Sequence, residues 1–385
     1  MIAAIINNLI WFSQSAISAG AFTETARYHL PYNQMRILIV KLGSIGDIIH
    51  TLPSLAAIRR AMPAAEISWV AEERSAEILR GNSMIDNLIE VDTQALRGGM
   101  VIEEILLSAS KQLKGLRRFK FDVAVDFQGL WKSGGIAKLS GAKRRWGFAR
   151  DGLREPASRI LLTDTVETPQ GIHIIEKNLA LAAGALNIVV PSDNFEFPIA
   201  TTDEHRAEAD AIITTAGEEF AVLNPGGGWV TKLWHADKFG QLADRLWEEK
   251  GLISIVATGP KETDLAEKIA ACSRTGHVIL SQPSLKGFYE LVKHASVYVG
   301  GDTGPTHIAV AAGAPVVGLF GPTEWWRNGS PNPDDICIER NDIDCRVDCH
   351  RRTCSKWICM DSDVETVYAA IQRRILATDL MDRHR

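Results

Sequence analysis

The sequence predicts an α/β protein with two facing domains, each built around a parallel β-sheet. Three observations predict this class. Short apolar runs alternate with stretches of helical period along most of the chain, which is typical of a doubly wound parallel sheet. The alternation stops at a stretch rich in proline and polar residues, 187–198, and then restarts. The chain has 385 residues, which is enough for two domains of ordinary size.

The domain limits follow from these breaks. We expect a first Rossmann-like domain over residues 35–195, a second over 196–360, and a C-terminal helix over 361–385 that packs back on the first domain. A cleft between two such domains is the default ligand site. Residues 1–34 look foreign to the rest, and we expect an extension of doubtful order. Either Met35 is the natural beginning, or the extension includes a short amphipathic helix at a membrane surface.

Each element of the first domain is predicted from its pattern. Apolar runs such as RILIV, EISWVAE and FDVAVDF suit strands buried on both faces, and apolar residues every three or four positions suit helices. The expected strands are 36–40, 66–72, 87–92 and 121–127, and the expected helices are 48–61, 74–80, 101–118, 132–140 and 173–186.

The same two patterns recur in the second half of the chain. The expected strands are 220–226, 253–259, 277–280, 297–302 and 315–321, and the expected helices are 203–216, 235–249, 262–272, 284–295, 304–313 and about 362–378. Two halves of similar size, each with this alternation, predict two sheets that face each other.

Composition and charge exclude several classes of function. An apolar content of 46% and a charged content of 23% indicate a globular protein. A net charge of −5 gives no case for non-specific nucleic-acid binding. Nothing in the sequence reaches the length of a transmembrane helix. Six cysteines in a chain this long do not make a disulfide scaffold, so a reducing cytosol is the default.

The first strand is followed by KLGSIGDIIHTLPSL, residues 41–55. Gly43 and Gly46 allow a tight turn, and Asp47 falls in the first turn of the next helix. One interpretation is that Asp47 caps this helix. The other is that it presents a carboxylate at the mouth of the sheet, where open α/β folds bind ligands.

The loop NPGGGWVTKLWHADKF, residues 224–239, follows a predicted strand of the second half. Its three glycines would expose backbone N–H groups, as a phosphate cradle needs, and Lys232 would add a positive charge. The alternative is a flexible glycine turn with a surface lysine.

A second loop lies in VGGDTGPTHIAVAAGAPVVGLFGPT, residues 299–323. Asp302 and Thr303 offer oxygens at a helix N-terminus, and the turn offers free N–H groups, which suit a diphosphate or a ribose. His307 follows one turn later. The alternative for His307 is a buried histidine whose hydrogen bonds are satisfied within the core.

Together, VKLGSIGDIIHTLPSL, GGGWVTKLW and GGDTGPTHIAVAAGAPVVGLFGPT resemble glycosyltransferase family 9, the lipopolysaccharide heptosyltransferases, from Met35 to about Leu376. VDFQGLWKSG (125–134) and REP (154–156) look closer to heptosyltransferase I than to heptosyltransferase II. The resemblance implies the GT-B fold. It also implies an inverting transfer of L-glycero-D-manno-heptose from ADP-heptose to the Kdo region of the lipopolysaccharide inner core, on lipid A.

The resemblance also implies roles for single residues. Asp47 matches the general base. The residues that match the donor side are Gly227, Gly228, Thr231, Lys232, Glu262, Asp302, Thr303, Gly304 and His307. Gln128, Lys132 and Ser133 fall in the region that faces the acceptor. One departure is that heptosyltransferase I relatives often carry a threonine pair where this chain has two glycines, at 227 and 228, which leaves room for a donor with another heptose or hexose.

The basic segment KRRWGFARDGLREPASR, residues 143–159, has two interpretations. One is a solvated surface loop. The other is an acceptor-binding patch that includes Arg144, Arg145 and Arg154, because an acceptor with Kdo carboxylates and lipid A phosphates would be drawn to cations. The acceptor also implies a cytoplasmic enzyme in peripheral contact with the inner membrane.

The reaction makes chemical sense from these residue types alone. Inverting glycosyl transfer needs an acceptor hydroxyl that loses its proton as it attacks, and a carboxylate such as Asp47 can accept that proton. The charge that grows on the leaving ADP can be stabilised by helix N-termini and Lys232, so no metal or other cofactor is expected for the chemistry. Domain closure would bring the two sides together.

Four cysteines near the C-terminus, Cys345, Cys349, Cys354 and Cys359, have the spacing C-x3-C-x4-C-x4-C. They could hold a structural zinc ion, or they could be reduced or loosely paired thiols.

Two further classes of function compete with a transferase. A nicotinamide-dependent oxidoreductase predicts G-x-G-x-x-G after the first strand, whereas this chain has G-x-x-G-D. A nucleotide-sugar-binding module without turnover is disfavoured by the presence of Asp47 and Lys232.

Overall fold

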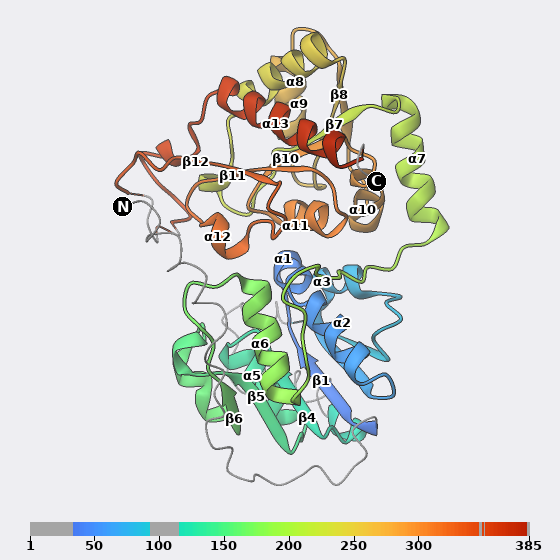
Figure 1. The fold of residues 1–385 in the computed structure, drawn as a ribbon, viewed down its shortest axis with the longest axis vertical. Coiled ribbons are helices and arrows are strands. Elements are labelled where there is room, and N and C mark those ends of the chain that lie inside the picture. The colour runs from blue at the N-terminus through green and yellow to red at the C-terminus, as the bar shows by residue number, and fades with distance from the viewer. Residues whose placement is uncertain (1–33, 93–114, 346–348, 350, 383–385) are drawn as a thin grey trace, which may run out of the picture.

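The computed structural model describes residues 34–92, 115–345, 349 and 351–382 and has two domains, one above the other in Figure 1. Each domain contains one six-stranded sheet whose strands are all parallel. The two-domain α/β expectation is therefore confirmed. Within the described residues, no helix combines the length and the apolarity that crossing a bilayer requires.

The first sheet has the strand order β3-β2-β1-β4-β5-β6. Its strands are β1 (Arg36–Val40), β2 (Glu66–Glu72), β3 (Asn87–Val91), β4 (Val123–Asp126), β5 (Arg144–Phe148) and β6 (Asp164–Val166). Alternate residues of β1 enter different cores: Ile37 and Ile39 belong to one apolar cluster, and Leu38 and Val40 belong to another. A central strand that is buried on both faces explains why RILIV is apolar throughout.

The helices of this domain include α1 (Ile45–Ile49), α2 (Leu52–Ala61), α3 (Glu73–Ala76), α5 (Trp131–Leu139) and α6 (Ile174–Leu186), with short 3-10 turns at 77–79, 116–119, 150–152 and 156–161. The single helix expected over 48–61 is divided after Ile49. Pro53 explains the break, because it has no N–H to donate to the preceding turn and is tolerated only near a helix start. Most of the helix expected over 101–118 lies outside the described residues.

The structure corrects the surface-loop interpretation of the basic segment, because its residues 144–148 form β5. This strand pairs with β4 and β6. The strand was not predicted because its first two residues are arginines, which are typical of a charged loop. Its last two residues, Gly147 and Phe148, are buried. Two short strands, β6 and β12 (Ile336–Glu339), were also not expected. Both lie at sheet edges, where an apolar run is not required.

The second sheet has the order β12-β11-β10-β7-β8-β9. Its other strands are β7 (Phe220–Asn224), β8 (Ile253–Ala257), β9 (Val278–Ser281), β10 (Val297–Gly301) and β11 (Val316–Phe320). In both domains the first strand lies beside the fourth, so the chain reverses its direction of winding there. Open α/β sheets bind ligands beyond the carboxyl ends of the strands at this point.

The helices of the second domain are α7 (Asp203–Ala216), α8 (Ala236–Lys250), α9 (Thr263–Cys272), α10 (Leu285–Val292), α11 (Gly304–Ala311), α12 (Trp325–Asn328) and α13 (Val364–Asp382). The expected helices are confirmed, and their ends agree to within a few residues. The C-terminal helix corrects one prediction. It packs on the second domain, against α8, β11 and β12, and not back on the first (Figure 1).

A buried ion pair fixes α13 in this position. Arg374 donates from Nε to Asp335 Oδ1 over 2.7 Å, and both side chains are at most 3% exposed. The same carboxylate oxygen accepts the backbone N–H of Val316, the first residue of β11. Burial raises the pKa of Asp335. The helix and the sheet are thus joined through one almost fully buried carboxylate.

We predict that Arg374→Met destabilises the protein by about 3–5 kcal/mol, because it leaves Asp335 buried without its cation. Unfolding in urea, followed by circular dichroism, measures this loss. Arg373→Met is the matched control, since Arg373 is exposed on the same helix and its loss should change stability by less than about 0.5 kcal/mol. Equal effects of the two substitutions would contradict the role of the pair.

Candidate functional site

The two domains touch where the elements after their central strands meet. α1 follows β1, α11 follows β10, and these two helices contact each other. At Gly46 in α1, an added Cβ atom would lie 2.3 Å from Cδ2 of His307 in α11. At Gly304, it would lie 3.2 Å from Cβ of Ile45. Gly46 was expected to allow a tight turn, but it lies inside α1, where its lack of a side chain serves the contact between domains.

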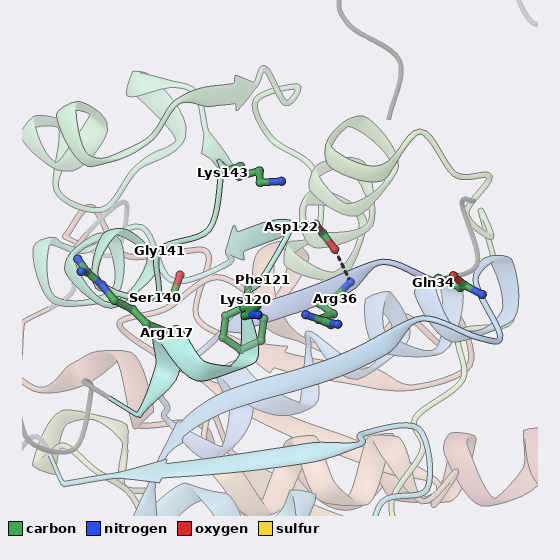
Figure 2. Close-up of a pocket in the computed structure, with 9 residues that line it drawn as sticks. All are labelled: Gln34, Arg36, Arg117, Lys120, Phe121, Asp122, Ser140, Gly141 and Lys143. Atoms are coloured by element: carbon green, nitrogen blue, oxygen red, sulfur yellow. Dashed lines mark hydrogen bonds between the residues drawn. The ribbon is translucent and has the colours of Figure 1, made fainter. Parts of the chain in front are cut away.

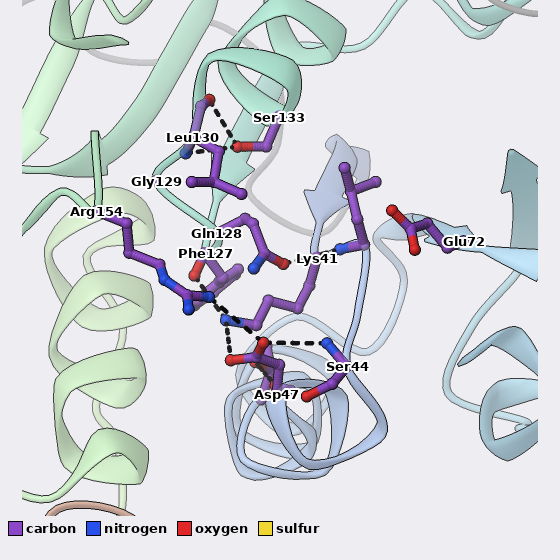
Figure 3. Close-up of polar contacts among 12 residues, drawn as sticks. Lys41, Ser44, Asp47, Glu72, Phe127, Gln128, Gly129, Leu130, Ser133 and Arg154 are labelled. Atoms are coloured by element: carbon purple, nitrogen blue, oxygen red, sulfur yellow. Dashed lines mark hydrogen bonds and ion pairs between the residues drawn. The ribbon is translucent and has the colours of Figure 1, made fainter. Parts of the chain in front are cut away.

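Asp47 is in the first turn of α1, and Figure 3 shows its carboxylate among cations. Ser44 is the N-cap residue of α1, and Asp47 is the third residue of the helix. Oδ2 accepts the backbone N–H of Ser44 over 3.0 Å, which is one half of a capping box. Nζ of Lys41 lies 3.4 Å from Oδ1, and a guanidinium nitrogen of Arg154 lies 3.6 Å from Oδ2. The side chain keeps 26% of its surface exposed. The two interpretations of Asp47 are therefore compatible, because one carboxylate caps the helix and faces the interface.

The charge state of Asp47 follows from these contacts. Burial raises the pKa of its carboxyl group, but the charges of Lys41 and Arg154 and the N–H of Ser44 outweigh burial and lower the pKa below its usual value. Asp47 is therefore an ionised carboxylate at neutral pH, held beside two cations. This arrangement can accept a proton from a bound hydroxyl group, at the cost of weakening the two ion pairs.

Lys41 is a site residue that the sequence analysis missed. Its side chain is 3% exposed, and Nζ also donates to the backbone carbonyl of Phe127 over 2.9 Å. A buried ammonium group is costly unless it is paired, so Asp47 and the Phe127 carbonyl explain how it is tolerated. The sequence did contain one indication of its role, because a lysine that directly follows a fully apolar strand lies at the edge of the sheet where ligands bind.

Around this pair, buried polar groups shape the loop after β4. Asp126 accepts the backbone N–H groups of Gln128 and Gly129 and the hydroxyl of Ser133. Burial raises the pKa of Asp126 to about 6, although these three donors oppose the shift. The amide oxygen of Gln128 accepts the N–H of Leu42. The described contacts of Gln128 and Ser133 thus lie within the protein.

The other residues expected on the acceptor side fall at both edges of the sheet. Lys132 pairs over 2.6 Å with buried Glu72, the last residue of β2, at the edge where Asp47 lies. Arg144 and Arg145 begin β5, at the amino ends of the strands, whereas Asp47 follows the carboxyl end of β1. Arg144 pairs there with Asp164 over 2.7 Å. Of the three arginines, the structure brings only Arg154 to Asp47.

On the second domain, Asp302 is the centre of a matching charge cluster. Oδ2 lies 2.6 Å from Nζ of Lys232, and Oδ1 lies 3.3 Å from Nε2 of His307. Burial opposes ionisation, but His307 and Lys232 lower the pKa of Asp302 far below its usual value. Nζ of Lys232 also lies 4.5 Å from the centre of the Trp229 ring. The structure thus brings three residues expected at the donor side into one network.

Glu262 and the glycines line the ends of β7 and β8. Oε2 of Glu262 accepts the N–H of Gly259 over 2.9 Å, and a Cβ at Gly226 would lie 2.5 Å from the same carboxylate. A Cβ at Gly227 would meet Leu233 at 2.8 Å, whereas one at Gly228 would meet nothing within 4 Å. The glycine loop therefore has no room for a side chain at Gly227 but has free space beside Gly228.

Thr303 and Thr231 are placed differently. Thr303 is the residue before α11, and its hydroxyl lies 3.5 Å from that of Thr306. Thr231 is buried, and its hydroxyl donates to the carbonyl of Arg351 over 2.6 Å. The side chain of Thr231 therefore points to the cysteine segment.

Three histidines gather at the domain interface. The ring of His50 lies 4.4 Å from that of His307 and 5.9 Å from that of His173, centre to centre. Nε2 of His173 lies 3.1 Å from the carbonyl oxygen of Gly329 in the other domain. Burial, followed by the charges of His307 and His173, lowers the pKa of His50 well below its usual value. His50 is a second interface residue that the sequence analysis missed.

The four cysteines line one small cavity of about 20 Å³, together with Thr231 and Trp357. All four are free thiols. Among the described residues, no three ligand side chains are grouped as a metal centre, and His350 lies outside them. A structural zinc ion there stays a prediction.

Comparison with known proteins gives the family. The model of glycosyltransferase family 9 (heptosyltransferase) matches residues 110–374, which is more than half of the chain. The chain belongs to glycosyltransferase family 9. It is 30% identical to lipopolysaccharide heptosyltransferase 1 of Pseudomonas aeruginosa, with 83% of this chain and 88% of the relative covered. Lipopolysaccharide heptosyltransferase 1 of Escherichia coli K12 is 27% identical, with coverage of 75% and 89%.

Solved structures agree with this assignment. E. coli heptosyltransferase WaaC with ADP-2-deoxy-2-fluoro heptose is 25% identical and superposes with a TM-score of 0.67, over 79% of this chain and 93% of that one. A family 9 glycosyltransferase from Veillonella parvula, 19% identical, superposes with a TM-score of 0.74 over 91% and 100%, which shows the fold alone. The GT-B architecture and the likeness to type 1 enzymes are thereby confirmed.

We predict that Lys41→Met shifts the acidic limb of the pH–rate profile of this glycosyltransferase upward by about one pH unit, because burial then raises the pKa of Asp47 with less opposition. Because the pKa of Asp47 starts below its usual value of about 4, the extra loss of transfer should appear only below about pH 5 and should be absent at pH 8. Sugar transfer measured from about pH 4 to pH 8 gives the profile. Lys138→Met, at an exposed lysine of α5, is the control. A uniform loss at every pH would contradict this role of Lys41.

Proposed function

We propose that this enzyme transfers L-glycero-D-manno-heptose from ADP-heptose to the Kdo region of the lipopolysaccharide inner core, with inversion at the anomeric carbon. The observation that carries the proposal is the pairing of two charge clusters, Asp47 on one domain and Lys232–Asp302 on the other, at the contact between α1 and α11. The names of the relatives and the heptose analogue bound to WaaC support this choice of substrates.

In the proposed reaction, Asp47 accepts the proton of the acceptor hydroxyl as its oxygen attacks the anomeric carbon. The bond between that carbon and the phosphate oxygen breaks, and ADP leaves with the electron pair. Lys232 and the backbone N–H groups at the start of α11 stabilise the charge that grows on ADP. Because Lys232 is paired with Asp302, the donor's phosphates compete with that carboxylate for the ammonium group.

Arg154 is the basic residue best placed to bind the acceptor. It lies 3.6 Å from Asp47 and its side chain is 59% exposed, so it can also contact an anionic sugar. Kdo carries a carboxylate, for which a guanidinium group is a good partner. Lys132 and Gln128, on the loop and helix after β4, would extend this side of the site.

The donor side rests on Glu262, Thr303, Gly304 and the glycine loop. The space beside Gly228 favours a donor that lies over the backbone there, with N–H groups in place of side-chain hydroxyls. The same space is compatible with a donor that carries another heptose or a hexose. We also propose that the enzyme works at the cytoplasmic face of the inner membrane, in peripheral contact, because the proposed acceptor is anchored there by lipid A.

We predict that Asp47→Asn lowers transfer by about 10²–10⁴-fold, because the amide cannot accept the proton. The assay is ADP release from ADP-L-glycero-D-manno-heptose in the presence of a Kdo2-lipid A analogue. Asp203→Asn, at a carboxylate that is 99% exposed, should retain full activity. Binding of ADP-heptose to Asp47→Asn should persist, measured by calorimetry. Undiminished ADP release by this variant would refute the role of Asp47, and no release by the wild type with intact donor binding would point to another acceptor.

We retain the structural zinc ion at Cys345, Cys349, Cys354 and Cys359 as a proposal, because the four thiols share one cavity. Metal analysis of the purified protein should give about one zinc ion per chain. The double variant Cys354→Ser/Cys359→Ser should lose the ion, and Cys272→Ser, at an exposed thiol of α9, should keep it. A zinc-free wild-type protein purified without chelator would favour reduced thiols.

A further inference from the structure

The first domain has a hollow at the edge of its sheet opposite to Asp47. A cavity of about 690 Å³ opens at the amino ends of β1 and β4. Figure 2 shows its lining residues, Gln34, Arg36, Arg117, Lys120, Phe121, Asp122, Ser140, Gly141 and Lys143. Strand β1 has five residues, so the cavity and the Asp47 loop lie roughly 16 Å apart along it. The cavity is thus separate from the site of transfer.

The lining is strongly basic, although the whole chain is acidic. The lining residues include four cations and one carboxylate, whereas the whole chain has a net charge of −5. Asp122 accepts the backbone N–H of Arg36 over 3.0 Å. Arg36 also has Glu66 at 3.6 Å. Within the described residues, no carboxylate lies at ion-pair distance from the other three cations.

The three remaining cations come from two different segments. Arg117 and Lys120 lie in and just after the 3-10 turn Leu116–Phe119, and Lys143 lies just before β5. All three side chains are exposed. Arg117 is steadied by a hydrogen bond from Nε to the carbonyl of Leu139 over 3.3 Å. Cations that converge on a concave surface raise the local potential more than the same charges on a convex one.

From this convergence of charge we propose that the cavity is a binding site for a phosphate-bearing anion, distinct from the donor and acceptor sites. Its volume suits a ligand of small-molecule size. Arginine and lysine side chains are the usual partners of phosphate oxygens. The phosphate belongs either to a soluble molecule or to the headgroup of an anionic lipid, and both sources have the same chemistry at this site.

The test measures anion binding to the full chain with ADP present in excess, so that the donor loops are occupied. One arm titrates inorganic pyrophosphate by calorimetry. The other arm measures sedimentation with vesicles of phosphatidylcholine that contain one third phosphatidylglycerol. Both arms compare the wild type with Lys143→Glu and with Lys268→Glu, which makes the same charge change at an exposed lysine of α9 in the other domain.

We expect Lys143→Glu to weaken binding at least tenfold in one arm and Lys268→Glu to change it less than twofold. A loss in the pyrophosphate arm identifies a soluble ligand, and a loss in the vesicle arm alone identifies a lipid headgroup. Lys120→Gln/Lys143→Gln, which removes two charges without adding a carboxylate, should show the same loss with an unchanged melting temperature. Equal binding by all variants in both arms, or equal losses at Lys143 and Lys268, would overturn the proposal.

Discussion

The arrangement of the site depends on one close contact, where the backbone of Gly46 meets the imidazole ring of His307. No side chain fits between them, since a methyl group on residue 46 would lie 2.3 Å from the ring. The next residue, Asp47, belongs to one charge cluster, and His307 itself belongs to the other. The absence of a side chain at position 46 therefore sets how near the two clusters lie. A larger residue there would press on His307 and move Asp47 away from the Asp302 cluster.

The two clusters share a design that suits anionic substrates. In each domain one carboxylate lies among cations, Asp47 with Lys41 and Arg154, and Asp302 with Lys232 and His307. The cations keep both carboxylates ionised despite burial. An incoming phosphate or carboxylate can exchange places with an internal carboxylate as partner of a lysine or an arginine. The protein thereby avoids unpaired buried charge both before and after a substrate binds.

The sequence was sufficient for the architecture because parallel strands that are buried on both faces leave a continuous apolar signature, as in RILIV. It also led to loops that meet at the contact between domains, because Asp47 and the loop that holds His307 follow such strands directly. It failed at β5, where Arg144 and Arg145 made a strand resemble a charged loop. Arg144, Arg145 and Arg154 are near one another in the sequence and were expected to bind the acceptor together. Strand β5 instead places Arg144 and Arg145 at the sheet edge opposite to Arg154. Lys41 was missed because its ion pair and its burial exist only in the folded chain.

The three histidines make the contact between domains sensitive to pH. His50 and His173 have lowered pKa values because they are buried and lie near other imidazole rings across the interface. When the domains separate, these rings regain water, and their pKa values return toward about 6.5. The separated form therefore binds more protons near that pH than the joined form does. By linkage, joining the domains releases protons, and the balance between the two forms shifts toward separation as the pH falls below about 6.5. A fall in pH would thus loosen the enzyme at its interface before it protonates Asp47.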